Sequence, residues 1–318
     1  MLRYTLHRIA LGLVSILILT MIVFAAAQVL PGNPGRLVLG REATPEAVEK
    51  FNEQLGYNRP LPVRYGDWLW SAVRGDFGAN YNDGRPVTDD LVPALERSAF
   101  LAFYAFMLCV PISVLAGVIA AIRRGKAADR TITIAGLSLA VIPEFVVGAI
   151  LVAVFGPALL GWFPGIAGAL IDASLFTKLD SLFLPALSLA LILFGYIARI
   201  TRAGVIEALA ADYTRTATLK GLPRRTVMGR HVVRNGILPT IAVVATQVGY
   251  MFGGIVAIEK LFGYPGVGLL TLTSAQIKNF PMLLACVLVI GIVYFIATLL
   301  GDLLTAALNP RIRLSAAQ

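Results

Sequence analysis

Long apolar runs separated by polar segments dominate the pattern along this chain. A helix that crosses a bilayer needs about 20 mostly apolar residues. Six segments reach about that length, at positions 9–30, 99–122, 131–155, 182–200, 240–258 and 282–304. The pattern therefore predicts an all-α membrane protein with six transmembrane helices.

The first apolar run has a second interpretation. Arg3 and Arg8 precede it, and Ala25-Ala26-Ala27 offers small residues of the kind found at a signal-peptide cleavage site. The apolar core of a signal peptide is usually about 7–15 residues long. Because this run is longer, we expect an uncleaved span.

Composition supports a membrane location. The chain is 58% hydrophobic and 14% charged, whereas soluble domains carry about 25% charged residues. The net charge is +9, but the basic residues lie between the spans, so they indicate topology and not nucleic-acid binding. Cys109, Cys286, His7 and His231 show no paired or metal-ligand spacing. We therefore expect neither a disulfide nor a metal site.

The placement of Lys and Arg predicts the orientation. Basic residues cluster in segments 1–8, 123–130, 199–239 and at the C-terminus. Segments 156–181 and 259–281 hold only three lysines as basic residues. Since cytoplasmic loops carry the excess of Lys and Arg, we expect a multi-pass protein of the bacterial inner membrane with both termini in the cytoplasm.

Segment 31–98 is long and mixed in charge. One short amphipathic helix is predicted to start at Pro45 and end at Gly56, and a second to cover 61–72. The segment reads as an extracytoplasmic subdomain, either a cap over the pathway or a docking surface. The glycine-rich stretch 262–268 lacks the Lys-Ser/Thr ending of a P-loop. It is interpreted as a re-entrant or pore-mouth turn.

The polar stretch 199–239 contains a predicted short helix between two spans. Asp212 is a plausible N-cap, Lys220 lies in the last turn, and Gly221 suits the left-handed residue that follows a helix. A short helix held at both ends moves as one body, so it could transmit a push to the spans. An ordinary basic loop is the alternative.

Several sequence pieces, in order, resemble the permease subunits of ABC importers, and among them the dipeptide/oligopeptide group that also includes nickel and glutathione importers. The pieces are Pro31-Gly32-Asn33-Pro34, Gly161-Trp162-Phe163-Pro164, Leu184-Pro185-Ala186, Ala198-Arg199-Ile200-Thr201-Arg202, the run 212–222 with His231 and Asn235, Tyr264-Pro265-Gly266-Val267-Gly268, and Asn309-Pro310-Arg311. Arg215-Thr216-Ala217 stands where importers generally have Glu-Ala-Ala, and Asn309 where the family usually has Asp.

The resemblance implies a fold and a site. The fold would be the six-helix ABC importer permease type, with an extracytoplasmic helical segment after the first span. The expected parts are an N-terminal helix at 1–30, the extracytoplasmic subdomain at 31–98, a five-helix core at 99–310 with the coupling loop 199–239, and a cytoplasmic tail at 311–318. The residues expected to couple to an ATPase are Asp212, Tyr213, Thr214, Arg215, Thr216, Ala217, Lys220, Gly221, Leu222, Arg225, His231 and Arg234.

The resemblance also implies partners. They are a second homologous permease, two cytoplasmic ATP-binding subunits that carry ATP and magnesium, and an extracytoplasmic substrate-binding protein. The substrate would be a di- or oligopeptide, or alternatively a nickel chelate or glutathione. This chain would bind no cofactor and catalyse no reaction. A secondary transporter or channel is the alternative from another class, and it would require broken helices and several ionisable residues within the spans.

Glu144 is the one carboxylate well inside a predicted span. Such groups are costly in lipid and usually face a bundle interior or water. Glu144 is therefore a candidate for the substrate pathway, as a contact for the ammonium group of a peptide. A structural carboxylate, paired with an arginine or protonated, is the alternative.

Overall fold

The computed structural model of the chain describes residues 2–29, 34–40, 42–54, 56, 58–81, 83–167 and 179–308. The chain divides into two compact units. Unit 1 comprises Met1–Thr5, Ala99–Tyr264 and Tyr294–Gln318, and unit 2 comprises Leu6–Ser98 and Pro265–Val293. Parts of the predicted motifs, at 31–33 and 309–318 with the predicted tail, lie outside the described residues. The four-part domain division made from the sequence stays a prediction.

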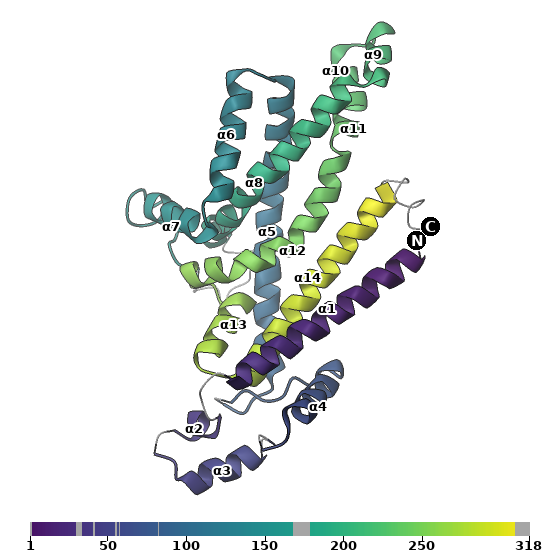
Figure 1. The fold of residues 1–318 in the computed structure, drawn as a ribbon. Helices are drawn as coiled ribbons and strands as arrows, with labels where there is room; N and C mark the ends of the chain where they lie inside the picture. The colour runs from purple at the N-terminus through teal and green to yellow at the C-terminus, as the bar shows by residue number, and fades with distance from the viewer. Residues whose placement is uncertain are drawn as a thin grey trace. The chain divides into compact units, whose positions relative to one another are not determined.

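The described residues are almost entirely helical, with a single isolated bridge between Ala79 and Pro86 (Figure 1). The helices are α1 Leu2–Val29, α2 Pro34–Leu39, α3 Pro45–Gln54, α4 Leu61–Val73, α5 Val87–Ile122, α6 Ala127–Val141, α7 Glu144–Phe155, α8 Leu179–Ala210, α9 Asp212–Leu219, α10 Arg224–Thr226, the π-helix η3 Val227–Val233, α11 Arg234–Gly236, α12 Leu238–Phe262, α13 Val267–Gln276 and α14 Phe280–Leu308.

Five described helices, α1, α5, α8, α12 and α14, are long and apolar enough to cross a membrane. The predicted third span is different. It consists of α6 and α7, which meet at an angle of 109°. The break falls at Ile142, whose backbone is extended (φ −79°, ψ 129°), just before Pro143. Proline lacks an N–H and disfavours helical geometry in the preceding residue, so the predicted span at 131–155 is a broken one. Counted as one span, this pair brings the candidate spans among the described residues to six.

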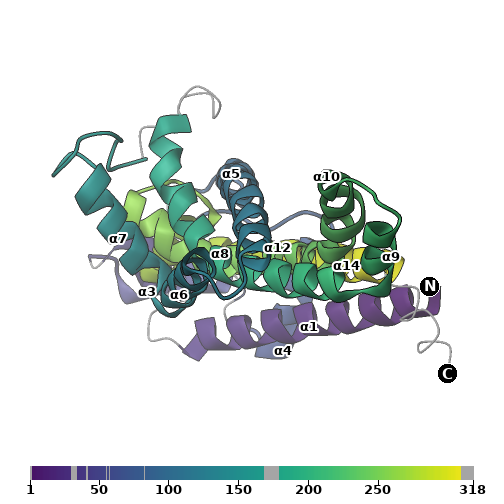
Figure 2. The same cartoon turned by 90° about the horizontal axis from the view of Figure 1, so that it is seen from above.

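In unit 1, α8 contacts α6, α7, α11 and α12. Small residues allow close approach at two of these crossings: Gly136 on α6 lies against Gly195 on α8, and Gly204 on α8 lies against Gly236 on α11. Glycines at such crossings let helix backbones come together in a membrane. Figure 2 shows α6 and α8 from above, with α9 and α10 next to each other at one end of α8. The helix α8 is therefore the common support of the unit.

In unit 2, both helices predicted within 31–98 are present. They are α3, which starts at Pro45, and α4. Helix α4 packs on α1 through Tyr65 and Trp68, whose rings lie 5.4 and 6.3 Å from that of Phe24. A separate apolar cluster joins the first turns of α5 to α13 and α14, through Val87, Leu91, Val267 and Met282 among others. The segment predicted to be extracytoplasmic is thus packed onto helices and does not hang as a free loop.

Candidate functional site

The predicted coupling helix exists as α9, and its end is the one the sequence indicated. Lys220 is the C-cap and Gly221 follows in the left-handed conformation, with φ +75°. Its start differs by one residue. Ala211 occupies the N-cap position, and Asp212 is the first helical residue, with no side-chain capping bond. The carboxylate of Asp212 still lies in the first turn, where the helix dipole favours a negative charge.

One face of α9 is buried against its own unit. Thr214 is 6% exposed, and its hydroxyl Oγ1 donates a hydrogen bond of 2.7 Å to the carbonyl of Ala208 at the end of α8. Ala217 joins an apolar cluster with Val205 and Ala208 of α8 and with Val227 and Val232 of η3. This cluster fixes α9 to the end of α8.

The other face of α9 and the chain after it are exposed. Tyr213, Leu222 and Leu219 have exposed fractions of 43%, 38% and 79%. Exposed residues of the predicted coupling set on this surface are Asp212, Tyr213, Arg215, Thr216, Lys220, Gly221, Leu222, Arg225 and Arg234, while His231 is half-buried. This surface therefore combines large exposed apolar side chains with several basic ones.

The link from α9 to α12 contains a feature the sequence did not predict. Residues Val227–Val233 form a π-helix that includes His231. The side chain of Asn235 donates a hydrogen bond of 2.7 Å to the carbonyl of His231. π-Helical turns are rare and frequent at functional sites. The hydrogen bond thus links His231 of the π-helix to Asn235 of α11.

An ion pair joins the first turn of α6 to α8. Arg202 Nε and Nη2 donate to the two oxygens of Asp129 at 2.6 and 2.9 Å, and the N–H of Gly125 donates to Asp129 Oδ2 at 2.8 Å. The side chain of Asp129 is 6% exposed and that of Arg202 is 30% exposed. The bidentate geometry is the strong form of this pair. It holds the basic turn at 123–126 close to the end of α8 that carries α9.

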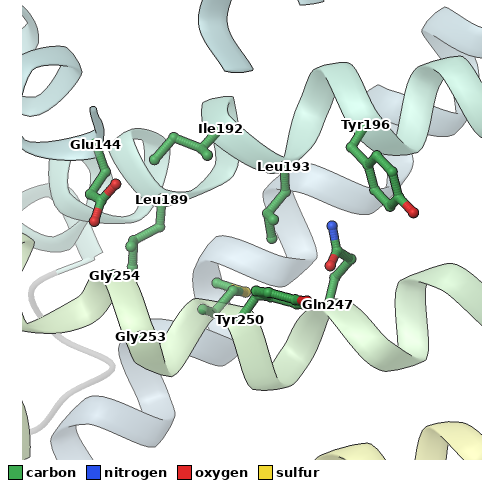
Figure 3. A pocket seen from close by; sticks show the side chains of 10 residues that line it. Glu144, Leu189, Ile192, Leu193, Tyr196, Gln247, Tyr250, Gly253 and Gly254 are labelled. Atoms are coloured by element: carbon green, nitrogen blue, oxygen red, sulfur yellow. The ribbon is translucent and has the colours of Figure 1, made fainter. Parts of the chain in front are cut away.

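Glu144 lies at a cavity in unit 1 of about 580 Å³ (Figure 3). It is the first residue of α7, directly after the break. The remaining walls come from α8 and α12: Leu189, Ile192, Leu193, Tyr196, Gln247, Tyr250, Met251, Gly253 and Gly254. Glu144 therefore lies on different elements from the predicted coupling residues and belongs to a separate site.

Besides the π-helix, three features of these sites were missed by sequence reasoning. The partner of Arg202 is 73 residues away, and no local pattern points to Asp129. Gln247 reads as one polar residue in an apolar run. The break at Ile142 was also missed, although Pro143 directly after it was a sequence signal for the end of a helix.

Loss of the Thr214 hydroxyl should loosen α9. In Thr214→Val the shape is kept, but the bond to the Ala208 carbonyl is lost, and we expect the docking of α9 to weaken by about 1–2 kcal/mol. Amide hydrogen exchange of residues 212–219 measures this opening. Thr218→Val is the matched control, because Thr218 Oγ1 donates only within α9, to Thr214 at 2.9 Å. Equal exchange in both variants would contradict the anchoring role.

Comparison with known proteins agrees with this architecture. Residues 113–314 match the family described as binding-protein-dependent transport system inner membrane component, and residues 1–88 match its N-terminal region. The chain belongs to this family. It is 33% identical over 317 residues to the glutathione transport system permease protein GsiC of Escherichia coli strain K12, covering 98% of this chain and 99% of that protein. The GsiC of Shigella dysenteriae serotype 1 shows the same identity and coverage.

Among solved structures, a chain in the crystal structure of an amino acid ABC transporter with histidines aligns with 70% of this chain and 94% of its own length. The TM-score of that alignment is 0.47 and the identity is 18%. The family assignment identifies this protein as an inner-membrane permease component of a binding-protein-dependent ABC importer, in the group that includes peptide, nickel and glutathione importers. Its helices α1, α5, α8, α12 and α14 are long and apolar enough to cross that membrane.

Proposed function

We propose that this permease pairs with a homologous second permease to import short peptides, driven by two cytoplasmic ATPase subunits that dock on α9. The observation that carries the proposal is the two-sided character of α9. One face is fixed to α8 by Thr214 and Ala217, and the other presents Tyr213 and Leu219 with basic side chains around them. A helix built in this way can receive a push on one face and deliver it to a transmembrane helix through the other.

The orientation in this proposal places α9 and both termini in the cytoplasm. Two basic segments, 123–130 and 199–239, should lie on the cytoplasmic side. The ion pair between Asp129 and Arg202 joins these segments directly, and Figure 1 draws the α5–α6 turn and α9 at the same end of unit 1. This proximity supports a topology in which the positive charge of both segments lies on one side of the membrane.

The remaining parts of the machine would come from partners. The ATPase subunits would supply ATP and magnesium, and an extracytoplasmic binding protein would deliver the substrate. Peptides are favoured because the relatives GsiC are named as glutathione permeases, and glutathione is itself a short peptide. This chain would then catalyse no reaction and bind no nucleotide.

Replacement of Gly221 by valine tests the coupling. The φ of +75° at Gly221 is a conformation that a β-branched residue adopts only with strain of about 1–3 kcal/mol. The end of α9 should then change shape while the spans stay intact. We expect peptide uptake per ATP hydrolysed to fall about tenfold, because the strain at this position corresponds to roughly that factor. The measurement is ATP-driven uptake of labelled alanyl-alanine by proteoliposomes that hold the complete transporter.

Gly221→Asn is the control, because asparagine tolerates the left-handed conformation better than other non-glycine residues. It should keep most of the uptake per ATP. If valine and asparagine behave alike, or if valine has no effect, α9 does not carry the coupling. If the wild-type complex imports without any ATPase subunit, the whole proposal fails.

A further inference from the structure

The cavity beside the α6–α7 break contains polar groups that the fold does not use. Its volume of about 580 Å³ lies within the range of small-molecule sites, about 300–1,000 Å³. All of its described walls belong to α7, α8 and α12 of unit 1. Most of the lining is aliphatic or aromatic, and the few polar groups converge on the same space. This is the composition of a ligand site.

Glu144 is the charged group of the cavity. Its Oε1 lies 3.1 Å from the position that a Cβ on Gly254 would occupy, so the absence of a side chain there makes room for the carboxylate. Among the residues that the structure describes, Glu144 has no hydrogen-bond or ion-pair partner, and Figure 3 shows its carboxylate beside the backbone of α12. A carboxylate at membrane depth usually has a partner or faces water. In this protein, a ligand bound in the cavity can be the partner of the Glu144 carboxylate.

Gln247 supplies a second, independent observation. Its residue is 8% exposed, yet among the described residues its amide has no hydrogen-bond partner. In Figure 3 the amide points from α12 toward α8, into the space between Leu193 and Tyr196. The amide atoms of Gln247 are open to the cavity, since among the described residues Trp68 Nε1 is the fully buried side-chain polar atom that lacks a hydrogen-bond partner. A ligand in the cavity with its own donor and acceptor can therefore hydrogen-bond to Gln247.

The aromatic walls complete the arrangement. Tyr196 and Tyr250 have exposed fractions of 38% and 66%, and both line the cavity. Aromatic faces attract cations as well as apolar groups. The Arg199 guanidinium already lies over the Tyr196 ring, 5.8 Å from its centroid, so the ring offered to a ligand cation is that of Tyr250. The cavity therefore offers a carboxylate at one end, an amide donor and acceptor at Gln247, and the ring of Tyr250 beside them. The ligand that satisfies all three is a primary ammonium attached to an amide backbone.

We infer that this cavity is an intramembrane binding site for the amino-terminal end of a short peptide, with its ammonium group on Glu144 and its first amide at Gln247. The inference rests on the proposed function and adds a contact within the permease to it. A purely structural Glu144, which stabilises the first turn of α7 through the helix dipole, is the competing account. The two differ in whether a ligand reaches the cavity and whether its free ammonium matters.

A cysteine at Gly253 can report occupancy directly. Nothing lies within 4 Å of a Cβ built on Gly253, so Gly253→Cys fits and faces the cavity. The native Cys109 and Cys286 are 2% and 0% exposed and should react slowly. The assay is the rate at which a water-soluble maleimide labels Gly253→Cys in the transporter purified in nanodiscs, with increasing alanyl-alanine. Gly66→Cys on α4, where a Cβ also meets nothing, controls for effects of peptide on the reagent.

The expected result is that alanyl-alanine slows labelling at Gly253→Cys but not at Gly66→Cys. N-acetyl-alanyl-alanine, which lacks the ammonium, should protect at least about tenfold more weakly, because a charge-assisted hydrogen bond contributes that much. Adding Glu144→Gln should raise the half-protecting concentration of alanyl-alanine by the same factor and leave that of the acetylated peptide unchanged. Glu144→Asp should restore part of the affinity, since it keeps the charge.

Three outcomes overturn the inference. They are no labelling of Gly253→Cys, equal protection by the two peptides, and equal half-protecting concentrations in wild-type and Glu144→Gln backgrounds. The assay uses neither ATP nor a binding protein. A transporter that shows ammonium-dependent protection but no ATP-driven uptake would therefore refute the proposed function alone, and the reverse pattern would refute the binding site alone.

Discussion

The substitution Gly195→Leu is expected to prevent α6 from packing against α8, and so to prevent unit 1 from folding. A Cβ at Gly195 would lie 2.7 Å from Gly136 Cα and closer still to the Gly136 carbonyl, and a Cβ at Gly136 would lie 2.8 Å from Gly195 Cα. Both neighbours are backbone, so no side-chain rotation can relieve the clash. One added methylene in a tight site costs about 1–3 kcal/mol, and a whole leucine must separate α6 from α8. We expect Gly195→Leu to yield no folded permease in detergent, by size-exclusion chromatography and thermal unfolding.

Gly195→Ala should lower stability by about 1–3 kcal/mol, which places it between the wild type and leucine. The control is Gly253→Ala, which substitutes another helical glycine of unit 1 where nothing lies within 4 Å. That change should be neutral or slightly stabilising, because alanine is the better helix former. A stable Gly195→Leu protein would mean that α6 and α8 do not cross at these glycines.

Arg202→Gln should destabilise the protein more than Asp129→Asn does. The first variant leaves the nearly buried Asp129 carboxylate without its bidentate partner, and breaking such a pair costs about 3–5 kcal/mol. The second leaves Arg202, whose side chain is 30% exposed and can turn toward water. Thermal unfolding of the purified permease measures both.

The double variant Arg202→Gln/Asp129→Asn supplies the control. Two neutral amides leave no unpaired charge, so it should be more stable than Arg202→Gln alone. If the two single variants lose equal stability and the double variant loses the sum, the residues act independently and the ion pair contributes nothing.

Much of this fold follows from local sequence. Apolar length identified the long helices, and Pro45 marked the start of α3. Gly221 marked the end of α9 because only a residue free to adopt positive φ suits that position. These features depend on a few neighbouring residues, so a single sequence determines them.

Other features depend on contacts between distant residues. Pro143 indicates a break, but the angle of 109° depends on how α7 packs. At Gly148 a Cβ would lie 2.7 Å from Leu261 and 3.3 Å from Ile258, both on α12. Likewise, the unpaired Gln247 acquires meaning only once α8 and α12 enclose it. Contacts of this kind between distant residues cannot be predicted until the fold is known.

The break at Ile142 separates α7 from a pair of helices that are tightly joined to each other. The pair is α6 and α8, locked backbone to backbone at Gly136 and Gly195 and fastened by the Asp129–Arg202 pair. If a partner displaces α9, we expect α6 and α8 to move together and the change in backbone angle to fall at the break between α6 and α7. That break is next to Glu144. We therefore expect a displacement of α9 to change the position of Glu144 relative to a charged ligand in the cavity.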